Sequence, residues 1–317
     1  MAKYIIKRII LMPVTLLLAA LFIFMMVSIS KTDPVLNMLP QEYTQEQYDA
    51  LEHELGLDQP MLVQYVKWIG HAFTGDFGTS YSTRNSVWNE IGFRIPTSAV
   101  LSLVTTVLIV IIGTVLGILC AVHQYSWIDN VINVFSKMLS AIPNFWIAMI
   151  FMLVFAMKMR VFPMFGTGTV LHWVLPVITL ALPGLAGHVR ITRSSMLDCI
   201  RQDYIRTARS KGEKESVVIY REALKNAMMP LITMTGNRFA MTIGSAVVVE
   251  RVFALPGLGT KVLDAINAMD VPVILACTTV LCAIYIVVML IVDLAYMFVD
   301  PRVKGRFVKA KKNKVAA

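Results

Sequence analysis

Charged side chains are scarce in this sequence, and their scarcity argues against a soluble globular domain. Only 15% of the 317 residues are Asp, Glu, Lys or Arg, whereas 57% are hydrophobic and the mean hydropathy is +0.67. A soluble domain usually has about 25% charged residues. The missing charge predicts a protein that holds much of its surface in lipid.

The sequence also lacks the motifs of common catalytic sites. It has no GxxxxGK[ST] phosphate-binding loop, because the glycine-rich stretch 257–261 has the wrong spacing. Its five histidines are scattered without an HExxH pattern, and no GxSxG nucleophile elbow is present. We therefore expect no catalytic residue, no metal site and no cofactor in this chain, and we do not expect it to be an enzyme by itself.

The few cysteines and the excess of positive charge both fit a membrane protein. The four cysteines lie in apolar runs or beside them, and their spacing fits neither a disulfide framework nor a metal motif. The formal net charge of +9 comes from Lys and Arg residues that sit beside the apolar runs, as in the cytoplasmic loops of membrane proteins. We therefore expect no nucleic-acid partner.

Six apolar runs are long enough to cross a membrane as helices. A helix rises about 1.5 Å per residue and the hydrocarbon layer is about 30 Å thick, so about twenty apolar residues suffice. The runs cover residues 9–29, 97–122, 131–157, 170–187, 231–249 and 273–299. The alternation of a β-barrel is missing, and lipid admits no other spanning structure. The predicted fold class is an all-α polytopic membrane protein with six transmembrane helices.

Basic residues at both ends set the expected orientation. Lys3, Lys7 and Arg8 precede the first run, and a basic tail at 300–317 follows the last one. Both termini are therefore expected in the cytoplasm, with the tail against anionic membrane lipid. The first run exceeds the apolar core of about 7 to 15 residues found in signal peptides, so we interpret it as a span.

We treat residues 1–317 as a single transmembrane domain. After the first span, residues 31–96 form an extracytoplasmic segment whose aromatic and turn residues predict short helices at the membrane surface. A core of five spans follows at 97–299, with a cytoplasmic loop at 190–230. The segment 31–96 either helps to receive an external binding protein or caps the bundle, and the sequence leaves both readings open.

One internal stretch, 198–230, is polar although apolar runs flank it. Residues 203–211 contain neither Gly nor Pro and predict a helix that ends where Gly212 takes a left-handed conformation. Glu213 and Glu215 then suit the first turn of a second helix, which runs towards Pro230. Two short helices that meet at a glycine predict a compact cytoplasmic unit, residues 203–221, which we call the elbow.

The elbow carries a recognisable motif. Residues 203–212 read DYIRTARSKG and are followed by Asn226-Ala227 and Pro230. This run resembles the EAA loop of ABC importer permeases, and most closely that of their peptide/nickel branch, although Arg206-Thr207 stand where the general motif has Glu-Ala. The resemblance implies that the loop docks on a cytoplasmic ATPase subunit. The residues so implicated are Asp203, Tyr204, Arg206, Thr207, Ala208, Arg209, Lys211, Gly212, Glu213 and Glu215.

A second motif follows the fifth apolar run. The pattern ExxFxxPGxG occupies residues 250–259 and resembles the external loop of the same permeases. Its proline and glycines permit a tight excursion back towards the bundle, over the mouth of a cavity. The candidate residues of this loop are Glu250, Phe253, Pro256, Gly257, Gly259 and Asp270. Residues 55–60 and 75–80 match as well, so the resemblance covers nearly the whole chain.

The resemblance implies a type I ABC importer permease in a bacterial inner membrane. In such systems a second homologous permease completes the route, two cytoplasmic ATPase subunits bind ATP and Mg, and an extracytoplasmic substrate-binding protein delivers the cargo. This chain would form half of the route, and dipeptides or oligopeptides are the expected cargo. Nickel or another metal chelate, and glutathione, stay open as alternatives.

Five residues are candidates for the transport route or its gate: Pro143, Asn144, Pro183, Asn237 and Arg238. Pro143-Asn144 interrupts the third apolar run. The fourth run carries two prolines and two glycines, which predict a broken helix that either moves as a gate or packs irregularly. Arg238 lies roughly 12 Å beyond Pro230, where it either lines an aqueous route or snorkels towards the inner surface.

An ion-coupled secondary transporter is the alternative from another class. It would need a carboxylate within the membrane or an inverted repeat. The six runs contain no Asp or Glu except Asp293, near the inner end of the last run, where water or a basic partner can reach it. The sequence therefore favours the ATP-driven importer.

Overall fold

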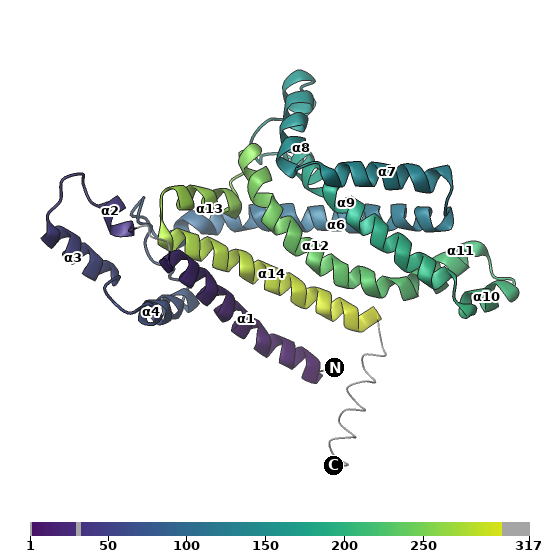
Figure 1. Cartoon of the computed structure of the whole chain (residues 1–317), viewed down its shortest axis with the longest axis horizontal. Coiled ribbons are helices and arrows are strands. Elements are labelled where there is room, and N and C mark those ends of the chain that lie inside the picture. Colours follow the sequence, from purple (N-terminus) through teal and green to yellow (C-terminus); the bar gives the residue numbers. More distant parts are fainter. Residues whose placement is uncertain (1, 30–32, 300–317) are drawn as a thin grey trace, which may run out of the picture.

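Helices make up nearly all of the described structure. The computed structural model describes residues 2–29 and 33–299, and within these residues β structure is limited to an isolated antiparallel bridge between Thr79 and Ser86. Most of the long helices run along the longest axis of the molecule (Figure 1). The predicted all-α class is confirmed.

Four helical stretches in the described residues are long and apolar enough to cross a membrane. They cover Arg8–Ile29, Val87–Val122, Leu171–Ile200 and Val271–Ala295. A bent pair, Trp127–Ala141 with Asn144–Lys158, gives a fifth candidate. The fifth expected run lies within α12 (Leu224–Val252), which is as long but carries polar residues such as Asn237. The count of six crossings and the placement of the termini stay predictions.

The first and last described helices lie together. α1 (Ala2–Ile29) packs along α14 (Val271–Val299), as Figure 1 shows. An ion pair of 3.1 Å between Arg8 Nη1 and Asp293 Oδ2 joins them. Of the two alternatives expected for Asp293, water or a basic partner, the structure shows the basic partner.

The segment between α1 and the second span contains the expected short helices. They are α2 (Pro34–Met38), α3 (Gln45–Leu55), α4 (Met61–Phe73) and α5 (Val87–Ile91). The Tyr65 hydroxyl of α4 donates a 2.8 Å hydrogen bond to the Leu17 carbonyl of α1, and the Tyr65 ring lies edge-on to Phe24. These contacts hold α4 against the outer part of α1.

The centre of the bundle is the pair formed by α6 (Ile95–Val122) and α9 (Leu171–Ile200). A Cβ atom on Gly113 would lie 2.9 Å from the His188 ring, and one on Gly117 would lie 2.4 Å from Thr192 Cβ. Two glycines four residues apart therefore let the two backbones approach closely. The spacing of Gly113 and Gly117 thus has a packing reason.

The broken helix expected in the fourth apolar run is wrong, and the second helix of the elbow runs past Pro230 rather than only towards it. α9 continues through Pro183 to Ile200 as one helix, and α12 continues through Pro230, which does not end the helix of the elbow. Each proline removes only one backbone donor, whereas ending a helix in lipid would strand several backbone groups without water. Continuation is therefore the less costly outcome at both prolines.

The third apolar run is bent far more sharply than a proline kink. α7 (Trp127–Ala141) and α8 (Asn144–Phe151), which continues as the π-helical segment Met152–Lys158, meet at 97°. Ile142 is extended, the conformation that the residue before a proline prefers, and Pro143 is extended as well. The run 131–157 is thus two separate helices.

The close contact at Gly117 makes a stability prediction. Gly117→Ala should lower the free energy of unfolding by about 1–3 kcal/mol, because the new methyl group overlaps Thr192. The measurement is denaturant unfolding of the purified protein in mixed micelles. Gly70→Ala on α4 is the matched control, because nothing lies within 4 Å of its Cβ position and alanine favours the helix. Equal effects of the two substitutions would contradict the packing described here.

Candidate functional site

The elbow lies at the end of the molecule towards which the start of α1 and the end of α14 also point (Figure 1). α10 (Asp203–Ser210) follows α9 almost directly, and Gly212 has a φ of 78°, which confirms the predicted turn. The second helix begins later than expected. α11 (Glu215–Val217) starts at Glu215, because Lys214 is extended and takes the N-cap position, so Glu213 lies in the turn.

Apolar side chains anchor the elbow to the bundle. Ile205 and Ala208, on one side of α10, are buried and pack with Met196 of α9 and Ile118 of α6. The π-helical segment η3 (Val218–Ala223) completes this cluster and leads without interruption into α12. A displacement of α10 would therefore act directly on α6, α9 and α12.

The opposite face of the elbow is polar and open. Its exposed residues include Asp203, Tyr204, Arg206, Thr207, Arg209, Lys211, Gly212, Glu213 and Glu215. Ala208 differs, because it belongs to the anchoring side. The residues that the motif implicated therefore divide into a buried base and a charged outer surface.

An ion pair closes the turn of the elbow. Arg209 donates to Glu215 with distances of 3.1 Å from Nε and 2.6 Å from Nη2. The Arg209 guanidinium lowers the pKa of Glu215 below its usual value. Because the pKa of Glu215 is lower in the folded protein, its ion pair with Arg209 stabilises the closed turn at pH values above the unfolded-state pKa. This contribution is lost as the pH falls through the folded-state pKa, so the ion pair stabilises the turn at neutral pH.

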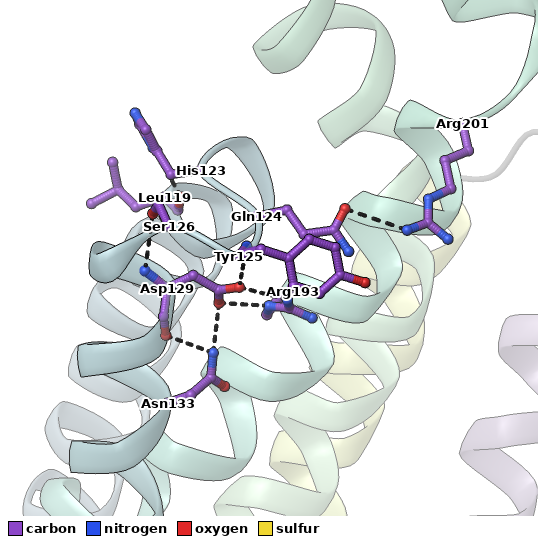
Figure 2. A network of polar contacts seen from close by, with 9 residues as sticks. All are labelled: Leu119, His123, Gln124, Tyr125, Ser126, Asp129, Asn133, Arg193 and Arg201. Atoms are coloured by element: carbon purple, nitrogen blue, oxygen red, sulfur yellow. Dashed lines mark hydrogen bonds and ion pairs between the residues drawn. The ribbon is translucent and has the colours of Figure 1, made fainter.

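A buried carboxylate joins α7 to α9 (Figure 2). Asp129, only 2% exposed, accepts hydrogen bonds from Arg193 Nε at 2.7 Å and Arg193 Nη2 at 2.6 Å. It also accepts from the Tyr125 backbone at 3.0 Å and from Asn133 Nδ2 at 2.6 Å. The paired geometry fixes α7 to the part of α9 that leads into the elbow.

The external motif is organised by a second buried carboxylate. Glu250 is fully buried and accepts a 2.6 Å hydrogen bond from the Ser98 hydroxyl of α6. It also accepts from the Thr260 backbone at 3.1 Å, in the first turn of α13 (Leu258–Asn267). Ser98 in turn accepts from the Leu258 backbone at 2.8 Å. Glu250 therefore satisfies the N-terminus of α13 and holds that helix against α6.

Steric contacts explain why glycine occupies positions 257 and 259 of this motif. A Cβ on Gly257 would lie 2.2 Å from the Glu250 carboxyl group, and one on Gly259 would lie 2.6 Å from Val247 Cα. Phe253 fills the core nearby and is 2% exposed. The chain therefore returns to the bundle after Pro256, as the sequence predicted.

Asp270 ties the start of α14 to residues 80–82. It accepts from the Ser80 hydroxyl at 2.5 Å and from the backbones of Tyr81 and Ser82, each at 3.2 Å. Asp270 is 2% exposed, so these donors replace its water. Two sequence motifs that lie 190 residues apart thus meet in one contact.

The route candidates are only partly brought together. Arg238 extends over α9 beside Pro183, with its Cδ close to Gly184 and its guanidinium close to Gly187. Asn237, the preceding residue of α12, is exposed. Pro143 and Asn144 instead begin α8, which packs against α9 and α12.

Sequence analysis missed Ser98 and Asp129. Ser98 lies at the start of an apolar run, and its partner Glu250 is 152 residues away, so no local signal pointed to it. Asp129 had a local signal, because Ser126-x-x-Asp129 is a helix N-cap pattern and the Ser126 hydroxyl does accept from the Asp129 backbone.

Comparisons with known proteins agree along the whole chain. The family described as "Binding-protein-dependent transport system inner membrane component" matches residues 113–305, and its N-terminal companion matches residues 1–103. The chain is 38% identical to the oligopeptide transport system permease protein AppB of Bacillus subtilis, covering 96% of this chain and all of the relative. It is 34% identical to the dipeptide transport system permease protein DppB of Lactococcus lactis (96% and 100%) and to the glutathione transport system permease protein GsiC of Salmonella typhimurium (96% and 99%).

The hydrogen bond between Ser98 and Glu250 predicts that substitutions at these two residues have non-additive effects on stability. Glu250→Ala should destabilise the protein, because Ser98 and the Thr260 amide lose a buried acceptor, at a cost of about 1–3 kcal/mol for each unsatisfied group. Unfolding of Glu250→Ala, Ser98→Ala and the double variant gives the interaction energy, which we expect to be about 1–2 kcal/mol. Asp264→Asn is the control, because its ion pair with Arg251 is exposed. Additive effects at Ser98 and Glu250 would disprove the coupling.

Proposed function

Because the chain belongs to the family of binding-protein-dependent transport system inner membrane components, we propose that it forms half of the route through a bacterial peptide importer. Membership makes the chain a multi-pass permease subunit of an ABC importer in the inner membrane, a system that also contains ATPase and binding-protein subunits. One observation carries the peptide assignment, namely the end-to-end similarity to permeases named for oligopeptide and dipeptide transport.

The elbow is the proposed contact with the ATPase subunits. Its exposed charged face offers a docking surface, and its buried base meets α6, α9 and α12. Two ATPase subunits that bind ATP and Mg would close on the elbows of two permeases and rotate the attached helices. ATP hydrolysis belongs to those subunits in this proposal, and this chain supplies no catalytic group.

A second homologous permease is the proposed partner across the route. One face of α12 is exposed along its length at positions spaced by three or four residues, namely Thr233, Asn237, Met241, Gly244 and Val248. Asn237 on this face is a poor neighbour for lipid, because an amide without a hydrogen-bond partner is costly there. The face therefore suits water and a facing subunit, and in this proposal Asn237 and Arg238 lie beside the route.

The opposite end of the molecule is the proposed receiving surface for the binding protein. α13 and the loop around Ser80 are joined there to α6 and α14 through Glu250 and Asp270. Delivery of cargo at this end, and ATP-driven movement at the elbow, would open and close the same helices from their two ends.

Charge reversal on the elbow tests the docking proposal. Arg206 is 77% exposed in its side chain and pairs only loosely with Asp203 at 3.6 Å, so Arg206→Glu should leave the fold intact. We expect at least a tenfold loss of co-purifying ATPase subunits, because the substitution reverses a charge on the docking face. Lys67→Glu on α4 makes the same charge change on an exposed residue of the other end and should leave co-purification unchanged. Equal recovery of ATPase subunits with both variants would refute the docking role.

Transport by the complete reconstituted importer tests the cargo assignment. Permeases, ATPase subunits and binding protein in proteoliposomes should accumulate labelled dipeptides or oligopeptides in the presence of ATP and Mg, and should not do so without ATP. Glutathione and a nickel chelate are assayed in parallel. Uptake of either of these without uptake of any peptide would reject the peptide assignment and leave the permease assignment standing.

A further inference from the structure

The Arg238 side chain lies against the neighbouring helix α9. A Cβ on Gly184 would lie 3.6 Å from Arg238 Cδ, and a Cβ on Gly187 would lie 2.4 Å from Arg238 Nη2. The side chain therefore lies along α9 from Gly184 towards Gly187. Since α9 runs on towards the elbow, the guanidinium points to the elbow end of the bundle.

The charge of Arg238 is not balanced within the described part of the chain. Its Nε atom is buried and has no hydrogen-bond partner, and no carboxylate among the described residues acts on the guanidinium. Arg190 lies three residues beyond Gly187 on α9, and therefore on the same face of α9 as the guanidinium of Arg238. Its positive charge opposes that of Arg238.

Arg193, the next arginine along α9, has a structural role in this protein. Arg193 lies three residues beyond Arg190 and is held by both oxygens of Asp129. The few other acidic groups near the spans are also engaged, since Asp293 pairs with Arg8 and Glu250 with Ser98. An unpaired cation inside a membrane protein is costly, and such residues commonly mark the path of a ligand or ion.

We propose that Arg238 and Arg190 form an anion-binding site in the elbow-side half of the transport route, and that this site receives a carboxylate group of the cargo. A guanidinium binds a carboxylate through two parallel hydrogen bonds, and the unused donors of Arg238 fit that role. The inference rests on the proposed peptide route, because every peptide with a free C-terminus carries such a group. Asn237 lies on the exposed α12 face and precedes Arg238 in the chain.

A single cysteine next to Arg238 can report the local charge. We would place Asn237→Cys in the complete importer, after replacing the four native cysteines. The thiol is then treated with the anionic sulfonatoethyl and the cationic trimethylammonioethyl methanethiosulfonates, whose rates are compared with those for a free thiol. The ratio of the two rates cancels any effect of the arginines on thiol ionisation.

The expected result is a strong preference for the anionic reagent, which Arg238→Gln lowers about tenfold and Arg238→Lys preserves. Arg251→Gln is the matched control on the same helix, because Arg251 is already paired with Asp264 at 2.7 Å, and it should leave the ratio unchanged. An unchanged ratio in Arg238→Gln would overturn the inference. Failure of both reagents to reach Cys at position 237 would also overturn it, because a lipid-facing or protein-covered residue is not part of an aqueous route.

Peptide uptake separates this inference from the proposed function. With wild-type protein, uptake of a labelled peptide tests the importer itself, whatever the thiol experiment shows. If the importer works, Arg238→Gln should slow the uptake of a free-acid peptide several-fold more than that of the same peptide with an amidated C-terminus. An equal loss for both peptides would assign Arg238 a structural role instead.

Discussion

Polar groups that are buried in this bundle must find their partners in the protein, because lipid supplies no water to replace them. Three carboxylates show how the chain meets this constraint. Glu250 accepts from Ser98 and from the first turn of α13, Asp270 accepts from three groups of the segment 80–82, and Asp129 is held by Arg193. Each of these carboxylates joins segments that are distant in the sequence.

The contacts of these three carboxylates lie at the two ends of the bundle, so each end is fixed by its own set of polar contacts. Glu250 and Asp270 fix α13 and the start of α14 at one end, whereas Asp129 fixes α7 to the part of α9 that leads into the elbow. Between the ends, α6 and α9 are held by the close packing of Gly113 and Gly117 and by a 3.1 Å hydrogen bond between Thr114 Oγ1 and His188 Nε2. The pair α6 and α9 therefore connects the two ends of the bundle.

Sequence could predict the features that depend on neighbours in the chain. The elbow turn at Gly212 and the return of the chain after Pro256 both follow from local backbone preferences, and the structure confirms them. The errors arose where tertiary surroundings decide. Pro183 and Pro230 lie inside continuous helices, and the bend of 97° at Pro143 exceeds what a proline alone imposes. The link from Ser98 to Glu250 spans 152 residues, so no pattern within a window could reveal it.

Arg238 is a charged residue for which this constraint is not met, and it can be compared with Arg193. Arg193 belongs to α9, and Arg238 projects from α12 towards α9. Only Arg193 is paired with a carboxylate, that of Asp129. Arg238 lies at an ordinary contact distance from Gly184, and its guanidinium occupies the space beside Gly187. A structural cation would be neutralised, as Arg193 is by Asp129. An unpaired guanidinium with Arg190 one helical turn beyond Gly187 on α9 therefore fits a charge that is completed from outside the chain, by an anion that passes.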